Sequence, residues 1–179
     1  MQNKSEEKFM EQMMHEYRVV IRSLLDAQST DFVENASLSH AAVILEEMVR
    51  DAKTSFFAVA DSLNPIAWNS DVVQSLSEAK RRGVDIELLV TTPDDASLSH
   101  LNGWDESVRS CIRRLSDKVR RSGVELANFA IMDRRAFRFE MDKDRASAVF
   151  CANNKTFAAK LVDNFRFLKS DALSLAPVV

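Results

Sequence analysis

A strand, helix, strand pattern over residues 55–90 constrains the fold of this chain more than any other feature. Residues 55–60 (SFFAVA) form a short continuous apolar run, which is typical of a strand covered on both faces. Residues 71–82 carry apolar side chains at helical spacing and end at Gly83, and residues 84–90 (VDIELLV) predict a second strand. Two strands joined in this way lie parallel through a right-handed crossover, so the pattern predicts an α/β fold.

The other expected elements follow from helical spacing, alternation and capping residues. The expected helices cover residues 5–27, from Ser37 or Ser39 to about Lys53, 105–122, and from Asn153 or Asn154 onward. The expected strands cover residues 124–132, 136–141 and 146–150, with a hairpin turn at 133–135. We interpret the polar residues 28–37 as a linker, which divides the chain into an amphipathic N-terminal arm (1–37) and a main domain (38–179).

Composition excludes several classes of protein. Hydrophobic residues make up 46% and charged residues 28% of the 179 residues, with a formal net charge of -3, which fits a globular chain and excludes a disordered or collagen-like one. No apolar run approaches the roughly 20 residues that a membrane span needs. The acidic N-terminus, MQNKSEEKFMEQ, is unlike a signal peptide, so we expect a cytoplasmic protein with no membrane contact.

The sequence carries no pattern for a metal or a cofactor. His15, His40 and His100 are scattered along the chain, and there is no glycine-rich phosphate loop or GxSxG motif. Cys111 and Cys151 lie within apolar patterns and are not spaced as a ligand pair, so we expect two buried, reduced thiols. We therefore expect neither a metal nor a cofactor.

Three stretches over residues 38–172 resemble one half of a phospholipase D-like domain: ILEEMVRDAKTSFFAVADSL, SEAKRRGVDIELLV, and GVELANFAIMDRRAFRFE continued by SAVFCANNKTFAAKLVDNFRFLKSDA. The resemblance implies a mixed sheet flanked by helices. In that family the hairpin strand holds a histidine, a lysine two residues later and an aspartate five residues after that. With Asp133 as the aspartate, Asn128 stands at the lysine position and Leu126 at the histidine position.

This departure from the motif implies binding without catalysis. The family's histidine takes the phosphoryl group and its lysine holds the phosphate oxygens, and neither leucine nor asparagine can do so. Single-half members resemble obligate dimers, which implies a homodimer or a subunit of a larger complex. The alternative is a remodelled phosphodiesterase or nuclease that uses Asp133, Asn128, Glu140 and His100, with residues 91–103 as a lid.

The first helix has the pattern of a partner-binding surface. Its apolar residues at three-four spacing are Met10, Met13, Tyr17, Val20 and Leu24. Such a stripe favours pairing with a second helix, from another copy or another protein. The alternative is that the stripe packs on its own domain.

Basic residues form candidate sites for nucleic acid or another phosphate ligand. The candidates are Arg109, Arg113 and Arg120 in the expected helix 105–122, and Lys80, Arg81 and Arg82 at the end of the crossover helix. The alternative is that they are solvated and offset the helix dipoles. Asp133 is similarly ambiguous, because aspartate also favours tight turns.

Overall fold

The computed structural model describes residues 2–91, 101–115, 126–142, 147–170 and 172–174. The helices are α1 (Gln2–Asp26), α2 (Leu38–Asp51), α3 (Ser70–Arg81), α5 (Glu106–Arg109) and α7 (Lys155–Ser170), with a short 3-10 helix at Leu101–Gly103. The strands are β1 (Phe32–Asn35), β2 (Ser55–Ala60), β3 (Asp85–Val90), β4 (Ile112–Leu115), β5 (Phe129–Met132), β6 (Ala136–Asp142), β7 (Ser147–Cys151) and β8 (Ala172–Ser174).

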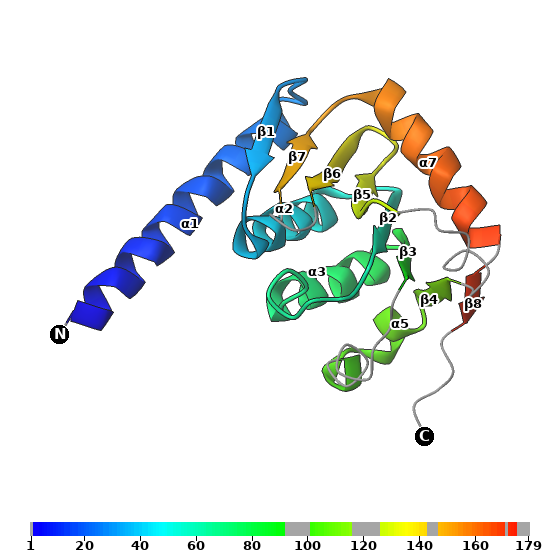
Figure 1. Cartoon of the computed structure of the whole chain (residues 1–179), viewed down its shortest axis with the longest axis horizontal. Coiled ribbons are helices and arrows are strands. Elements are labelled where there is room, and N and C mark those ends of the chain that lie inside the picture. Colours follow the sequence, from blue (N-terminus) through cyan, green and yellow to red (C-terminus); the bar gives the residue numbers. More distant parts are fainter. Residues whose placement is uncertain (1, 92–100, 116–125, 143–146, 171, 175–179) are drawn as a thin grey trace.

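Over these described ranges, one mixed sheet of eight strands runs in the order β1-β7-β6-β5-β2-β3-β4-β8 (Figure 1). The crossover unit is confirmed: β2 and β3 are parallel, with Ser55 opposite Asp85 and Ala60 opposite Val90. The side chain of Asn69 caps α3, and Gly83, with φ of +86°, lets the chain leave the helix in a conformation that other residues disfavour. The predicted α/β sheet flanked by helices is therefore confirmed.

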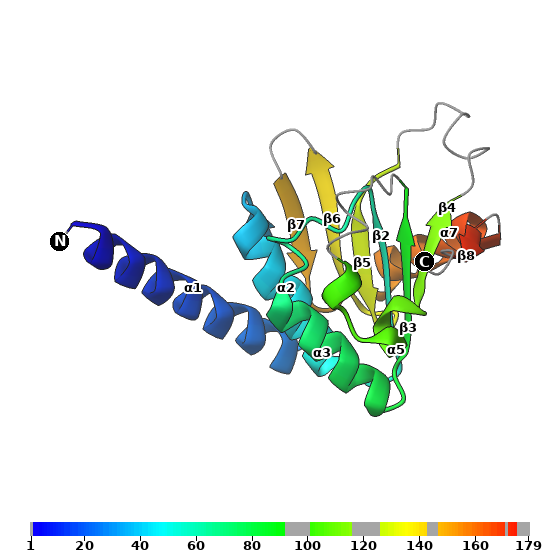
Figure 2. The ribbon, with the colours of Figure 1, turned by 90° about the horizontal axis from the view of Figure 1, so that it is seen from below.

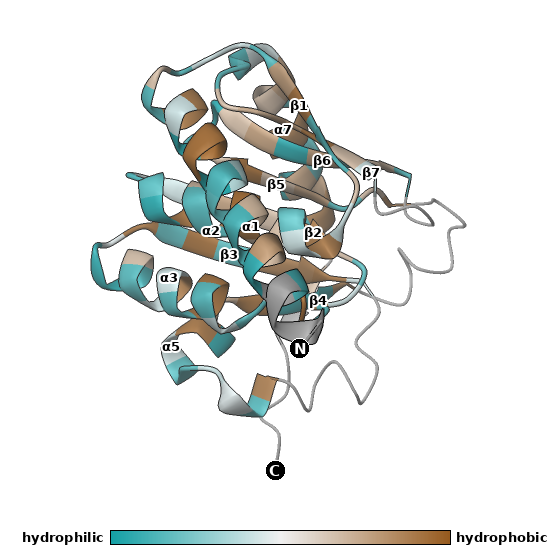
Figure 3. Cartoon of the chain, turned by 90° about the vertical axis from the view of Figure 1, so that its left-hand side faces the viewer, coloured by the Kyte–Doolittle hydropathy of each residue, from teal (hydrophilic) through white to brown (hydrophobic). Residues whose placement is uncertain are grey.

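The sheet separates two apolar layers. Helices α2 and α3 cover one face, and α7 covers the other (Figure 2). Because side chains alternate along a strand, Ala130 and Met132 of β5 join the first layer, whereas Phe129 and Ile131 join the second. The central strands β2 (SFFAVA) and β5 (FAIM) are accordingly hydrophobic on both faces, while the outer helices show both hydrophobic and hydrophilic residues (Figure 3).

Helix α1 packs on α2 with its C-terminal half and extends away from the domain with its N-terminal half (Figures 1 and 2). Ile21 and Leu25 are buried in the core. Arg18 and Arg22 form ion pairs with Glu47 of α2, at 3.0 and 2.8 Å. The expected helical arm is thus present, and half of it belongs to the domain.

Two expectations are wrong. Residues 28–37 are no linker, because Phe32–Asn35 forms edge strand β1, antiparallel to β7. Over residues 105–115, the expected helix 105–122 is instead the single turn α5 followed by β4, which pairs in parallel with β3, and residues 116–122 lie outside the described ranges. The exposed edge of β3 offers backbone hydrogen bonds to residues 112–115, and this pairing overrides their helical spacing.

The predictions for the two cysteines and for the start of the last helix are confirmed. Cys111 and Cys151 are free and buried, as predicted. The last helix begins after Asn154, whose side chain accepts a hydrogen bond from the Phe157 N–H at 3.0 Å, as predicted for a cap. In the part of the chain that the structure describes, no helix has the length and apolarity needed to span a bilayer.

Candidate functional site

A cavity of about 430 Å³ lies where the sheet meets the first turns of α2 and the loop after β2. Its apolar lining includes Leu38, Ala41 and Leu45 of α2, Ala67 and Trp68 of the loop, and Ala130 of β5. Its polar lining includes Asp61, Ser62, Asn64, Asn128, Arg138 and Glu140. The cavity therefore lies at the carboxyl end of β2, the edge at which open α/β sheets commonly bind ligands.

Asn128, at the lysine position of the resembled motif, connects β2, β5 and β6 at this edge. Its Oδ1 accepts a hydrogen bond from the Asp61 N–H at 2.7 Å, and its Nδ2 donates to Glu140. The side chain of Asp61 accepts in turn from the hydroxyl of Thr91, at 2.9 Å. Asn128 thus fixes the shape of the cavity's polar rim.

Arg138 and Glu140 are charged residues on the sheet face that α2 covers. They are 7% and 8% exposed, and Arg138 Nη2 lies 3.8 Å from Glu140 Oε1, which is too far for a hydrogen bond. Arg138 Nε is buried without a hydrogen-bond partner. Burial lowers the pKa of Arg138 from its ordinary value, although the charge of Glu140 opposes this. The cavity therefore holds a guanidinium group whose hydrogen-bonding capacity is not used in full.

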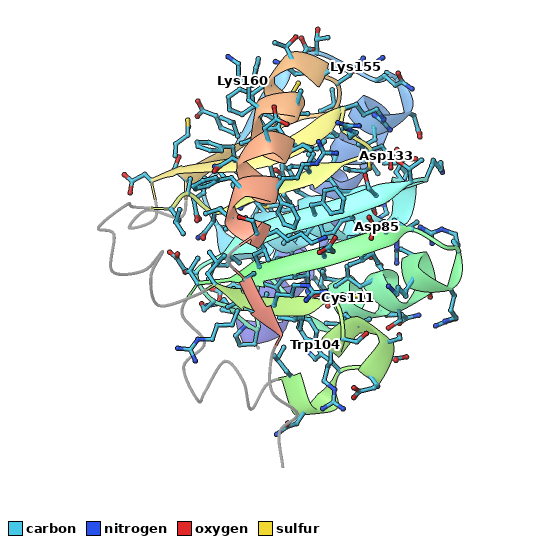
Figure 4. The ribbon with its side chains drawn as sticks, turned by 90° about the vertical axis from the view of Figure 1, so that its right-hand side faces the viewer. Asp85, Trp104, Cys111, Asp133, Lys155 and Lys160 are labelled. Atoms are coloured by element: carbon cyan, nitrogen blue, oxygen red, sulfur yellow. The ribbon has the colours of Figure 1, made fainter. Side chains whose placement is uncertain are left out.

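Asp133 lies at the opposite end of β5 from Asn128, about 16 Å along the strand at 3.3 Å per residue. Asp85, the first residue of β3, lies at the same end of the strands as Asp133 (Figure 4). The carboxylate of Asp133 accepts hydrogen bonds from the backbone N–H groups of Lys53, Thr54 and Ser55, at 2.8 to 2.9 Å, and from the Thr54 hydroxyl, at 2.9 Å.

This environment sets the charge state of Asp133. Burial alone would raise the pKa of the carboxyl, but the hydrogen bonds from Ser55, Thr54 and Lys53 hold it below its ordinary value. The carboxylate is therefore ionised and fully engaged in fastening the hairpin turn to the start of β2.

The residues of the remodelled-enzyme alternative are not all brought together. Asn128 and Glu140 are in contact, but Asp133 is remote from both. His100 lies outside the described residues. Leu126 packs against the apolar layer under α7, on the other side of the sheet from the cavity. The histidine and lysine positions of the motif therefore face different surroundings here.

The basic residues singled out from the sequence lie on separate elements. Lys80, Arg81 and Arg82 lie at the C-terminal end of α3, at the opposite end of the strands from the cavity. Arg82 donates hydrogen bonds to three carbonyl groups at the end of α2, at 3.1 to 3.4 Å. Arg109 pairs with Glu106 on α5, and Arg113 Nε lies 3.8 Å from Glu87 Oε2.

Arg120 falls outside the described residues. None of the described members of this set lines the cavity. The structure therefore does not gather them into one phosphate site.

The apolar stripe on α1 divides into two parts. Tyr17 and Leu24 pack against the core, whereas Met10, Met13 and Val20 are 53%, 43% and 49% exposed. The exposed part continues toward the free end of the helix, where Phe9 is also exposed. The uncovered part of the stripe thus begins with Met10 and Met13 on the projecting half of the helix and continues to Val20, which stays exposed on the half that packs on α2.

Arg138 is the site residue that sequence reasoning missed. The alternation in Ala136–Asp142 (AFRFEMD) marks Arg138 and Glu140 as neighbours on one face of a strand. That signal carries information only when the strand is known to lie under a helix. In the described residues, no group of three His, Cys, Asp or Glu side chains is placed to hold a metal ion.

No protein-family model and no curated protein matches this sequence. The fold is similar to that of TrmBL2, described as an archaeal chromatin protein with a novel mode of DNA binding, at 13% identity and a TM-score of 0.64. That match covers 97% of this chain and 66% of TrmBL2, so the chain spans slightly less than two thirds of that protein.

Two further structures match a shorter part of the chain. Nuc from Salmonella typhimurium, a phospholipase D family member, is 16% identical with a TM-score of 0.57, over 81% of this chain and 99% of Nuc. NucT from Helicobacter pylori is 10% identical with a TM-score of 0.56, over 81% of this chain and all of NucT. At these identities the likeness concerns the fold, and the fold of this chain is phospholipase D-like.

Proposed function

We propose that this chain is a non-catalytic phospholipase D-like module that pairs with a second copy of itself through α1 and works in association with nucleic acid. The observation that carries the proposal is helix α1, whose N-terminal half projects from the domain and whose stripe of Met10, Met13 and Val20 is uncovered. Apolar side chains at this spacing on a helix that leaves its own domain are stabilised by a second helix.

The absence of catalysis rests on Leu126 and Asn128. Leucine has no nucleophilic atom, and the amide of Asn128 is already bonded to Asp61 and Glu140. We expect no turnover of bis-p-nitrophenyl phosphate or of nucleic acid. Turnover that is lost in Asn128→Ala, in a protein that still folds, contradicts this part of the proposal.

The association with nucleic acid is supported by the likeness to TrmBL2, which extends over 97% of the chain. The net charge of -3 supplies no long-range attraction for a polyanion. We therefore expect binding that falls steeply as salt rises, measured by anisotropy of labelled single- and double-stranded DNA and RNA at two salt concentrations. No binding to any of these at low salt refutes the nucleic-acid part and leaves self-association to be tested separately.

Two adjacent valines on α1 provide a matched test of self-association. Val20 lies on the stripe, and Val19, turned by about 100° around the helix, does not. The two are 49% and 52% exposed, so replacing either by glutamine changes a similar area of exposed surface.

Light scattering after size exclusion measures the mass in solution. We expect the wild-type chain and Val19→Gln to have twice the mass of one chain. Val20→Gln should shift the protein toward the monomer, because a polar group would then be buried in the helix pair. A wild-type protein that stays monomeric at the highest attainable concentration contradicts the proposal, as does an equal effect of Val19→Gln.

A further inference from the structure

The cavity beside Asn128 combines features that the proposed self-association and nucleic-acid binding do not use. Arg138 is more than nine-tenths buried, lines the cavity, and has a buried Nε without a hydrogen-bond partner. Buried guanidinium groups in proteins are ordinarily hydrogen-bonded, because an unsatisfied buried donor is costly. An incompletely bonded guanidinium that lines a cavity indicates a missing acceptor.

The neighbour of Arg138 narrows the chemistry of that acceptor. Glu140 Oε2 receives the amide of Asn128, while Oε1 lies 3.8 Å from Arg138 Nη2. The N–H donors of Arg138 and the carboxylate acceptor of Glu140 therefore lie side by side, but they are farther apart than a direct hydrogen bond allows. A ligand that places a carboxylate on Arg138 and an adjacent N–H or O–H on Glu140 satisfies both groups.

The rest of the lining limits the charge and shape of the ligand. The carboxyl groups of Asp61 and Glu140 both line the cavity with Arg138, so a doubly charged phosphate would be repelled. The apolar wall formed by Leu38, Leu45 and Trp68 suits a hydrocarbon group. About 430 Å³ is within the range of small-molecule sites. The loop residues Asp61, Ser62 and Asn64 are partly exposed, so the cavity reaches the surface there.

We propose that this cavity binds a small carboxylic acid that carries an amino or hydroxyl group on the adjacent carbon and an apolar side chain, with the carboxylate on Arg138 and the second group on Glu140. The first turn of α2 borders the same space, and its N-terminal dipole adds to the attraction for a carboxylate. This inference does not depend on pairing through α1, since the α1 residues that would pair do not line the cavity.

A panel of related probes tests both contacts in the full chain. The panel contains L-leucine, 2-hydroxy-4-methylpentanoate, 4-methylpentanoate, which lacks the second group, 3-methylbutylamine, which lacks the carboxylate, and inorganic phosphate. Trp68 lines the cavity, and the chain has two tryptophans. Trp104→Phe therefore leaves Trp68 as the sole tryptophan reporter of fluorescence during titration.

The expected order of affinity follows from the two contacts. The amino acid and the hydroxy acid bind, 4-methylpentanoate binds more weakly, and the amine and phosphate do not bind. Arg138→Met weakens binding of the amino acid and the hydroxy acid about 10- to 100-fold, the range for loss of a charged hydrogen bond. Glu140→Gln weakens the amino acid more than the hydroxy acid, because glutamine still accepts from a hydroxyl group but no longer attracts an ammonium group.

Controls separate binding from folding. Lys160→Met removes a positive charge from exposed α7, on the opposite face of the sheet (Figure 4), and should leave the titrations unchanged. If Arg138→Met does not fold, Arg138→Lys keeps the charge but loses the two-pronged donor, and the same weakening is expected. The inference is overturned if no probe alters Trp68 emission at millimolar concentration, if phosphate binds through Arg138, or if binding survives in the folded Arg138 variants.

Discussion

Replacing Asp133 tests whether this motif residue holds the fold together. Its carboxylate accepts three backbone hydrogen bonds and one from a hydroxyl, which join the β5–β6 turn to the start of β2. Hydrogen bonds to a charged acceptor contribute about 1.5–3 kcal/mol when buried, and Asp133 is partly exposed, so we take about 2–3 kcal/mol for the set. Alanine at φ of +50° costs about 1 kcal/mol more, because its Cβ is disfavoured in the left-handed region.

We therefore expect Asp133→Ala to lower the free energy of unfolding by about 3–4 kcal/mol at neutral pH. Asp133→Asn should cost about 1–2 kcal/mol, because asparagine tolerates the left-handed region and keeps one acceptor oxygen. Urea unfolding followed by circular dichroism measures both values, with the change expected in the midpoint and not in the slope. The matched control is Asp163→Ala on α7, whose carboxylate is 79% exposed and should contribute less than about 0.5 kcal/mol.

The pH dependence gives a second, independent measurement. The folded pKa of Asp133 lies below the ordinary value of 3.8, so its contribution is present above that value and is lost as the pH falls through the folded pKa. The stability difference between wild type and Asp133→Asn should be constant near neutral pH and should shrink below about pH 4. A folded Asp133→Ala protein within about 1 kcal/mol of wild type refutes the structural role that we assign.

Three further substitutions or modifications test individual contacts. Arg82→Met should destabilise the chain by about 1 kcal/mol, because it removes the hydrogen bonds to the end of α2, whereas the exposed neighbour Arg81→Met should change stability by less than about 0.5 kcal/mol in the same urea assay. Burial raises the pKa of the Cys151 thiol, so iodoacetamide should modify Cys151 only after unfolding, and mass spectrometry that finds rapid alkylation in the native protein contradicts this. Burial also raises the pKa of Tyr17 to about 12, against the opposing charge of Arg138, and its hydroxyl has no partner. Tyr17→Phe should therefore leave the thermal stability unchanged or raise it by up to about 1 kcal/mol.

The parts of the fold that could be predicted from the sequence are those whose signal is local. The crossover over residues 55–90 contains an apolar run, an amphipathic helix and Gly83 after the helix. Each of these features determines the local conformation through residues that are close in the sequence. The strands after it alternate around a turn of Asp133 and Arg134, both with positive φ, which also acts locally.

The errors concern segments whose structure depends on a distant partner. Phe32–Asn35 is a strand because β7 offers an edge more than 110 residues later in the chain. Val108, Ile112 and Leu115 have the spacing of one face of a helix. All three are nevertheless buried in the short helix α5 and the strand β4 that this segment forms. Ile21 and Leu25 are buried because α2 lies beneath them, and the spacing of α1 alone does not identify α2 as that partner.

The charged residues of the cavity could not be predicted either, because their burial also depends on an element that is distant in the sequence. In β6, period-two alternation places Arg138 and Glu140 on one face and Phe137 and Phe139 on the other, which in an antiparallel hairpin indicates a solvated polar face. Here the polar face lies under α2, so both charges are buried, and small residues such as Ala41 and Ala130 leave space in front of them. Charged residues kept on a strand face that a helix covers indicate a site, because apolar residues there would pack without the cost of burying charge.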